Sequence, residues 1–157
     1  MTAIGVVLLL TSALGISLYL MAEGKQRITA LEAVCSLIGF IRQNIKTFGT
    51  PLDGILDSCR IEYFEKISFG PLLRQKGLAV AAKECTFPID RNAKLEFEAF
   101  AESAGKGYRD EEIKRCEYYL SRFEAYLATE KERFHRLRPM YRYLPILGAL
   151  SVIIMLI

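Results

Sequence analysis

The sequence predicts an all-α protein, a helical bundle held between N-terminal and C-terminal transmembrane helices. Three observations support this class. The first 22 residues and the last 15 carry no charged side chain, although the chain holds 21 Lys and Arg and 18 Asp and Glu. Apolar residues between these ends recur at spacings of three and four, the period of a helix. Strand signals are weak throughout. This composition excludes an ordinary soluble enzyme, a disordered chain and a multi-domain protein.

The first predicted element is a transmembrane helix over residues 1–22. As a helix this segment is roughly 33 Å long at about 1.5 Å per residue, which is enough for a hydrocarbon core of about 30 Å. A cleaved signal peptide is the alternative. No basic residue precedes the apolar run, and Leu20-Met21-Ala22 is a poor cleavage site, so an uncleaved anchor is favoured.

The last predicted element is a second transmembrane helix over residues 143–157. It is short for a span unless Met140, Tyr141 and a snorkelling Arg142 extend it. Cations lie on the inner side of both segments, and by the positive-inside rule these clusters belong in the cytoplasm. We therefore expect a two-pass cell-membrane protein with both tails outside and a cytoplasmic domain over residues 23–142. The flanking cations are Lys25, Arg27, Lys131, Arg133, Arg136, Arg138 and Arg142.

The cytoplasmic domain should begin with a helix over residues 25–48 that continues the first membrane helix. Thr50 and Pro51 form a helix-restart turn, with Thr50 as the N-cap and Pro51 in the first helical position, where its missing N–H is harmless. A short helix over 52–59 follows. Further short helices are expected over 61–67 and 72–82, separated by a break at Gly70-Pro71.

The second half of the domain should contain two longer helices. Residues 86–90 form a loop that ends in a cap, and a helix over 91–104 follows, with apolar positions at Leu95, Phe97, Phe100 and Ala101. Gly105-Lys106-Gly107 ends that helix. The next helix begins near Asp110-Glu111-Glu112, which we interpret as solvated acids of the first turn.

The clearest periodicity in the chain follows this acidic start. Residues that are all apolar except Glu130 alternate spacings of three and four without a slip, which is a heptad seam. Pro139 should kink or restart the helix. The seam either packs inside the chain against the helix over 25–48 or turns part of itself to another subunit, with Leu127, Glu130 and Phe134 as the candidate interaction seam. Its members are Ile113, Cys116, Leu120, Phe123, Leu127, Glu130, Phe134, Leu137, Tyr141 and Leu144.

The sequence offers no site for catalysis, a cofactor or a metal. Its four cysteines are scattered at Cys35, Cys59, Cys85 and Cys116, and His135 is the sole histidine, so zinc-ligand spacing is absent and a nucleophile would depend on that one base. Residues 104–107 lack the glycine and hydroxyl positions of a phosphate loop. We therefore predict no enzyme, no cofactor, no small-molecule substrate and no nucleic-acid partner.

Membrane contact is the best supported interaction. The membrane-proximal basic cluster, defined as Arg133, Arg136, Arg138 and Arg142, sets topology and attracts anionic lipid headgroups with about 1 kcal/mol per cation. In the first segment, the pairs Thr11/Gly15 and Ala13/Ser17 have a small-xxx-small spacing that could seat another membrane helix.

Several of these residues carry a family resemblance. In chain order, these are Ile4-Gly5 with Gly15, Arg27 before a Leu31/Leu37/Ile41 stripe, and the turn over 48–52. The last is the tail from Tyr141-Arg142 through Leu144, Ile146-Leu147-Gly148 and Leu150 to Val152-Ile153-Ile154. Together they resemble the stage III sporulation protein AB family. Gln43, Asn44, Pro145 and Ala104-Gly105 depart from the family pattern.

The resemblance implies a cytoplasmic helical bundle similar to the platform protein of type II secretion and type IV pilus systems. It also implies residence in the mother-cell membrane around the forespore, with a companion ATPase and other channel-complex subunits as partners, and no catalytic residues. Self-association of the chain is a further expectation. The alternative is a membrane-tethered helical sensor or regulator, hinged at residues 105–107.

Overall fold

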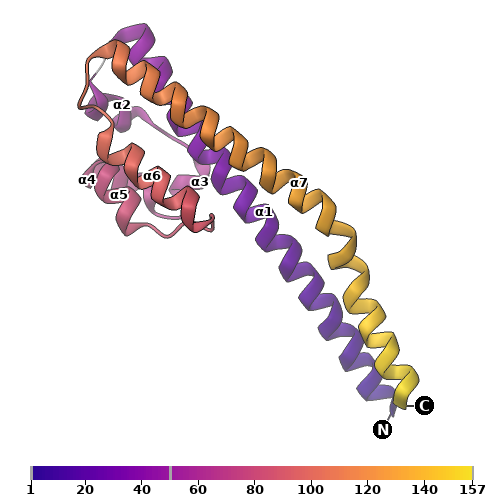
Figure 1. The fold of residues 1–157 in the computed structure, drawn as a ribbon. Helices are drawn as coiled ribbons and strands as arrows, with labels where there is room; N and C mark the ends of the chain where they lie inside the picture. Colours follow the sequence, from indigo (N-terminus) through magenta and orange to yellow (C-terminus); the bar gives the residue numbers. More distant parts are fainter. Residues whose placement is uncertain (1, 50, 157) are drawn as a thin grey trace. The chain divides into compact units, whose positions relative to one another are not determined.

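A computed structural model describes residues 2–49 and 51–156 of the protein. Thr50 and the side chain of Arg142 are outside this description, so the predictions made for them lie outside the described residues. No strand occurs in the described part of the chain, which confirms the all-α class (Figure 1). The helices are α1 (Thr2–Phe48), α2 (Leu52–Ser58), α3 (Glu62–Lys66), α4 (Phe69–Lys76), α5 (Leu78–Glu84), α6 (Arg91–Ser103) and α7 (Arg109–Leu156).

The chain divides into two compact units, and the two long helices contribute to both. Unit 1 contains residues 1–26 and 129–157, and unit 2 contains residues 27–128. As predicted, α1 runs without interruption from the apolar N-terminal segment into the amphipathic stretch. Residues Thr11–Phe48 of α1 form the one helix of the described residues that is long and apolar enough to cross a membrane. The C-terminal span therefore stays a prediction.

Unit 2 is organised around phenylalanine side chains from several helices. The Phe69 ring centroid lies 4.5 Å from that of Phe64 and 5.1 Å from that of Phe87, and Phe97 lies 5.5 Å from Phe87 and 6.3 Å from Phe123. These edge-to-face and tilted contacts each add about 0.5–1.5 kcal/mol beyond burial. The core is completed by the α1 stripe Leu31, Val34, Leu37, Ile38, Ile41 and Ile45.

The predicted apolar faces of α1 and α6 each include one residue that is not buried. Phe48 is exposed, so the buried face of α1 ends at Ile45, and Leu95 on α6 is also exposed. Phe48 lies beyond the last element that covers α1, and Leu95 lies off the buried face of α6, which begins at Ala93. Phe97, Phe100 and Ala101 are buried on α6, as expected.

The short helices break at other places than predicted. Gly70 and Pro71 lie inside the first turn of α4, where a proline removes no helical hydrogen bond because the first such bond runs from the Leu72 N–H to the Ser68 carbonyl. The break comes at Ser68, whose φ is 62°. The predicted helix over 72–82 is divided into α4 and α5 at Gly77, whose φ of 81° is a conformation that favours glycine.

The helix starts and the proline of α7 can be compared directly with the prediction. Pro51 is the N-cap of α2 and not its first helical residue, so the helix begins one position later than predicted. Asp90 is the N-cap of α6, and its carboxylate accepts a hydrogen bond from the Asn92 N–H at 3.0 Å, so the predicted cap is confirmed. The α7 helix continues through Pro139 and does not restart there.

Candidate functional site

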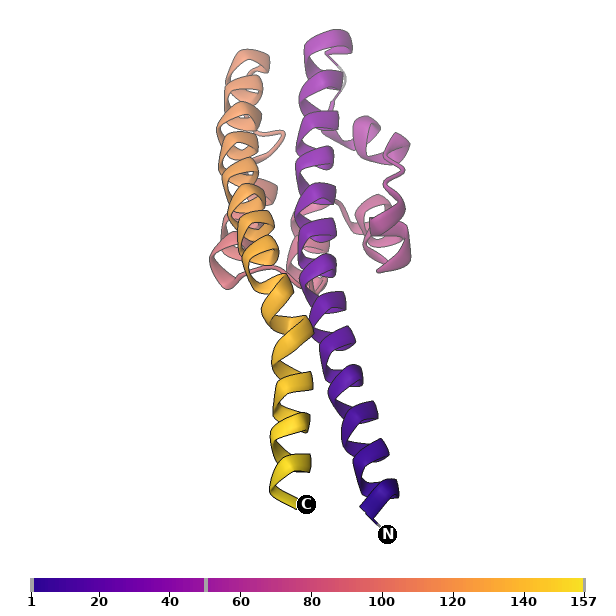
Figure 2. The same ribbon diagram turned by 90° about the vertical axis from the view of Figure 1, so that its right-hand side faces the viewer.

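In unit 1 the ends of α1 and α7 lie side by side and antiparallel, with both chain termini at the same end (Figures 1 and 2). Ala13 and Ser17 are buried, which means that this small-residue pair packs within the chain. At Gly24 the Phe134 ring of α7 packs directly on the α1 backbone, since an added Cβ would lie 2.6 Å from Cδ2 of Phe134. The absence of a side chain at Gly24 makes room for this ring.

The arginines of the membrane-proximal basic cluster differ in whether an acidic side chain pairs with them. Arg133 Nη1 lies 3.7 Å from Glu130 Oε1, and Arg136 donates to Glu132 Oε1 at 2.6 Å. Each of these cations therefore has an acid one turn earlier on α7. Arg138 is exposed, and no hydrogen bond or ion pair joins it to any side chain in the described part of the protein. Among the three arginines of this cluster whose side chains the structure describes, it is the one whose charge stays available to an external anion.

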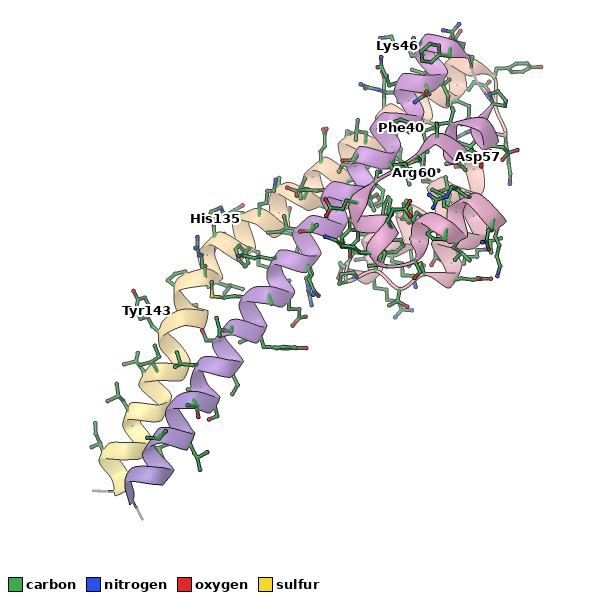
Figure 3. The ribbon with its side chains drawn as sticks, turned by 180° about the vertical axis from the view of Figure 1, so that it is seen from behind. Phe40, Lys46, Asp57, Arg60, His135 and Tyr143 are labelled. Atoms are coloured by element: carbon green, nitrogen blue, oxygen red, sulfur yellow. The ribbon has the colours of Figure 1, made fainter. Side chains whose placement is uncertain are left out.

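A groove lies between α1 and α7 within unit 1, with a volume of about 590 Å³. Most of its wall is aliphatic, and Arg138 is the one cationic side chain among its described lining residues. Tyr143, which extends from α7 (Figure 3), also reaches the groove and is exposed. The lining residues, referred to below as the interhelical groove, are Leu14, Ser17, Leu18, Met21, Arg138, Pro139, Tyr143 and Ile146.

The heptad seam of α7 faces the inside of the chain over much of its length. Cys116 and Phe123 are fully buried in the core of unit 2, and Leu127 packs at its edge. In unit 1, Phe134 packs against Gly24 and Glu130 is the partner of a basic residue. The packing of the seam inside one chain explains its periodicity, and contact of Leu127, Glu130 and Phe134 with another subunit stays a prediction.

The connection from α6 to α7 is braced by Glu112, which was expected to be a solvated acid and is only 4% exposed. Its carboxylate accepts hydrogen bonds from the Gly105 N–H at 3.0 Å and the Gly107 N–H at 2.8 Å. Arg115 donates to it as well and also to the Ser103 carbonyl at 2.8 Å. Burial alone would raise the pKa of this carboxyl, but these donors together lower it below its usual range.

One end of unit 2 exposes two aromatic side chains, Phe48 at 74% and Tyr108 at 84%. They lie at the same end because the neighbouring Arg109 donates a hydrogen bond to the Lys46 carbonyl. Figure 3 labels Lys46 at this end. Exposed aromatic residues are enriched at protein interfaces. We refer to Phe48 and Tyr108 as the aromatic tip.

The side chains that a reaction would require are the cysteines, the histidine and the acids. No group of His, Cys, Asp and Glu suited to a metal ion occurs in the part of the chain that the structure describes. The four cysteines are free thiols, and burial raises the pKa of Cys116 to about 11, which makes it a poor nucleophile. His135 is exposed on α7, beside the Phe134 ring (Figure 3).

Comparison with known proteins decides the family. A family model described as stage III sporulation protein AB matches residues 76–157, just over half of the chain. The chain belongs to the stage III sporulation protein AB family. The match includes the Tyr141-Arg142 tail on which the sequence resemblance rests, and it begins after the turn over 48–52. No curated protein and no solved structure matches the chain. Membership in this family gives the protein a role in stage III of spore formation.

Sequence reasoning missed three features of this family member. The bracing role of Glu112 depends on the backbone of a turn, although an acid five residues after Gly107 at a helix start was a usable signal. The interhelical groove depends on the register between two helices. The lack of an acidic partner for Arg138 is readable from the sequence. Arg133 and Arg136 each have an acid three or four residues earlier, and Arg138 has His135 and Phe134 at those positions.

Proposed function

We propose that this chain is a non-enzymatic platform subunit of a secretion-like complex that crosses the envelope between mother cell and forespore. In this account both uncharged ends span the mother-cell membrane as a helical hairpin, and the bundle over residues 23–142 lies in the cytoplasm. The observation that supports it most strongly is the antiparallel pairing of the ends of α1 and α7 in unit 1, where the Phe134 ring packs on Gly24 just beyond the uncharged segments.

Charge and hydrogen bonding are consistent with insertion of this pair. Every charged residue of the chain lies between Glu23 and Arg142, so neither proposed span carries a charge into the hydrocarbon. The Thr11 hydroxyl donates to the Val7 and Leu8 carbonyls within its own helix, at 3.0 Å each. A polar side chain satisfied in this way can face lipid at low cost.

The cytoplasmic domain supplies a surface and no reaction centre in this proposal. The aromatic tip is the contact site that we assign to the companion ATPase, because its two rings are exposed and lie at one end of unit 2. Rings held by a packed bundle can bury apolar area against a partner with little loss of conformational entropy.

A membrane-tethered sensor, hinged at residues 105–107, is the alternative reading. The three hydrogen bonds that Glu112 receives at this turn, from Gly105, Gly107 and Arg115, resist such a hinge motion. The platform is therefore the function that we favour.

Site-specific photocrosslinking in sporulating cells tests the platform proposal. A photoreactive amino acid at Tyr108 should capture an ATPase, and the same amino acid at Tyr118, which is exposed on α7 away from the tip, serves as the matched control. His135→Gln should sporulate normally. The proposal is contradicted if gentle detergent extraction yields only a lone monomer and if Tyr108 captures no more protein than Tyr118. Loss of sporulation in a correctly inserted His135→Gln chain would instead favour an enzyme.

A further inference from the structure

We propose that the interhelical groove binds one bilayer phospholipid with an anionic headgroup, with the phosphate at Arg138 and an acyl chain along the apolar wall. The inference rests on the proposed function, because it requires both ends of the chain to be inserted in the membrane. It adds a specific lipid site to that function, which the general attraction of basic residues to a membrane surface does not provide.

The interhelical groove changes from cationic at one end to apolar at the other. Because α1 and α7 are antiparallel, Met21 and Arg138 belong to the end near the charged part of the chain, and Leu14 and Ile146 belong to the end within the uncharged segments. From Leu14 to Met21 the groove extends about 10 Å at 1.5 Å per residue. A groove that is cationic at one end and aliphatic along its length matches the two parts of a phospholipid.

The charge of Arg138 is complementary to that of a lipid phosphate. Glu130 and Glu132 are already the partners of Arg133 and Arg136, and Arg138 has no ion-pair partner among the described side chains. A guanidinium presents five donors in a planar fork that matches a phosphate group. The structure thus holds an uncompensated cation at the point where a lipid headgroup would lie.

The residues around the groove favour a lipid over a second copy of this chain. Close packing of membrane helices uses small residues, and the buried pair Ala13 and Ser17 is already used within the chain. The rim of the groove instead carries exposed Leu18 and Tyr143. A second helix there would desolvate Arg138 without supplying an anion, which is unfavourable. Tyrosine is enriched at the headgroup level of membranes, where its hydroxyl stays hydrated.

Fluorescence quenching by brominated lipids tests this site in the full chain. The protein contains no tryptophan, so Tyr143→Trp places its single tryptophan in the groove, where it is excited selectively over the tyrosines. The reconstituted chain is titrated with brominated phosphatidylglycerol or brominated phosphatidylcholine at equal mole fractions. We expect an association preference of about five-fold for phosphatidylglycerol, the ratio that corresponds to roughly 1 kcal/mol at one cation.

Variants in the Tyr143→Trp background assign this preference to the groove. Arg138→Gln should abolish it, Arg138→Lys should keep part of it, and Arg136→Gln, which removes a cation already paired with Glu132, should leave it unchanged. Leu14→Phe, which narrows the apolar end, should lower quenching by phosphatidylglycerol.

The outcomes separate this inference from the proposed function. Equal quenching by the two lipids, or equal losses in Arg138→Gln and Arg136→Gln, overturns the lipid site while leaving insertion intact. Quenching by neither lipid, with crosslinking between copies through the groove, identifies a second chain as the occupant and also overturns it. If neither lipid quenches and no crosslink forms, the segment is outside the bilayer, and the proposed function fails together with the inference.

Discussion

The brace at Glu112 gives the most quantitative prediction, made for the substitution Glu112→Gln. The side chain keeps its size but loses its charge, and its amide nitrogen faces the donors of Gly105, Gly107 or Arg115. Hydrogen bonds to a charged group contribute about 1.5–3 kcal/mol each, and a glutamine oxygen retains part of them. We expect a loss of about 2–3 kcal/mol in the free energy of opening the turn.

The effect should depend on pH in a defined direction. The pKa of Glu112 is lower in the folded protein than its unfolded value of about 4.3. Its contribution is therefore fully present above the unfolded pKa and is lost as the pH falls through the folded pKa. The difference between the native chain and Glu112→Gln should be largest near neutral pH and should shrink below about pH 4.

Limited trypsin digestion measures this opening, because Lys106 lies within the braced turn and is exposed. In full-length protein in detergent, the cleavage rate at Lys106 should rise about 30- to 150-fold in Glu112→Gln, provided that opening and closing are faster than cleavage. Asp110→Asn removes an exposed acid from the same first turn of α7 as Glu112, and it should leave the cleavage rate unchanged. An unchanged rate in Glu112→Gln, or an equal rise in Asp110→Asn, would refute the bracing role.

Three further substitutions test the packing. Gly24→Ala should destabilise the helix pair of unit 1 by about 1–3 kcal/mol through overlap with the Phe134 ring, and Phe134→Ala in the same chain should recover most of that loss in urea unfolding. Ser68→Gly should raise the free energy of unfolding by about 0.5–1 kcal/mol, because it relieves a left-handed serine. Phe97→Ala should lower it by about 3–5 kcal/mol, and a smaller loss than Leu95→Ala would contradict the core assignment.

The long helices could be predicted from the sequence because their signals are local and repeated. The apolar spacing repeats over several helical turns both from Ile113 to Phe134 and from Leu31 to Ile45. Asp90 before α6 is a cap that one residue encodes. Such features depend little on the rest of the fold.

The parts that the sequence did not predict depend on tertiary contacts. Ser68 adopts a left-handed conformation that its residue type does not favour, so the break before α4 had no local signal. The sequence predicts a break at Pro71 because nothing local shows that this proline falls in a first turn. The interhelical groove depends on how Leu14 and Ile146 align across two helices distant in sequence.

The central claim is that both uncharged ends cross the membrane and leave the bundle in the cytoplasm. Single-cysteine chains, in which the four native cysteines are replaced, carry Tyr108→Cys or Ile157→Cys. They are exposed to a membrane-impermeant maleimide in intact cells before engulfment. We predict that Ile157→Cys is labelled at once and that Tyr108→Cys is labelled only after permeabilisation. Labelling of Tyr108→Cys in intact cells, or protection of Ile157→Cys until the cells are permeabilised, would contradict the account.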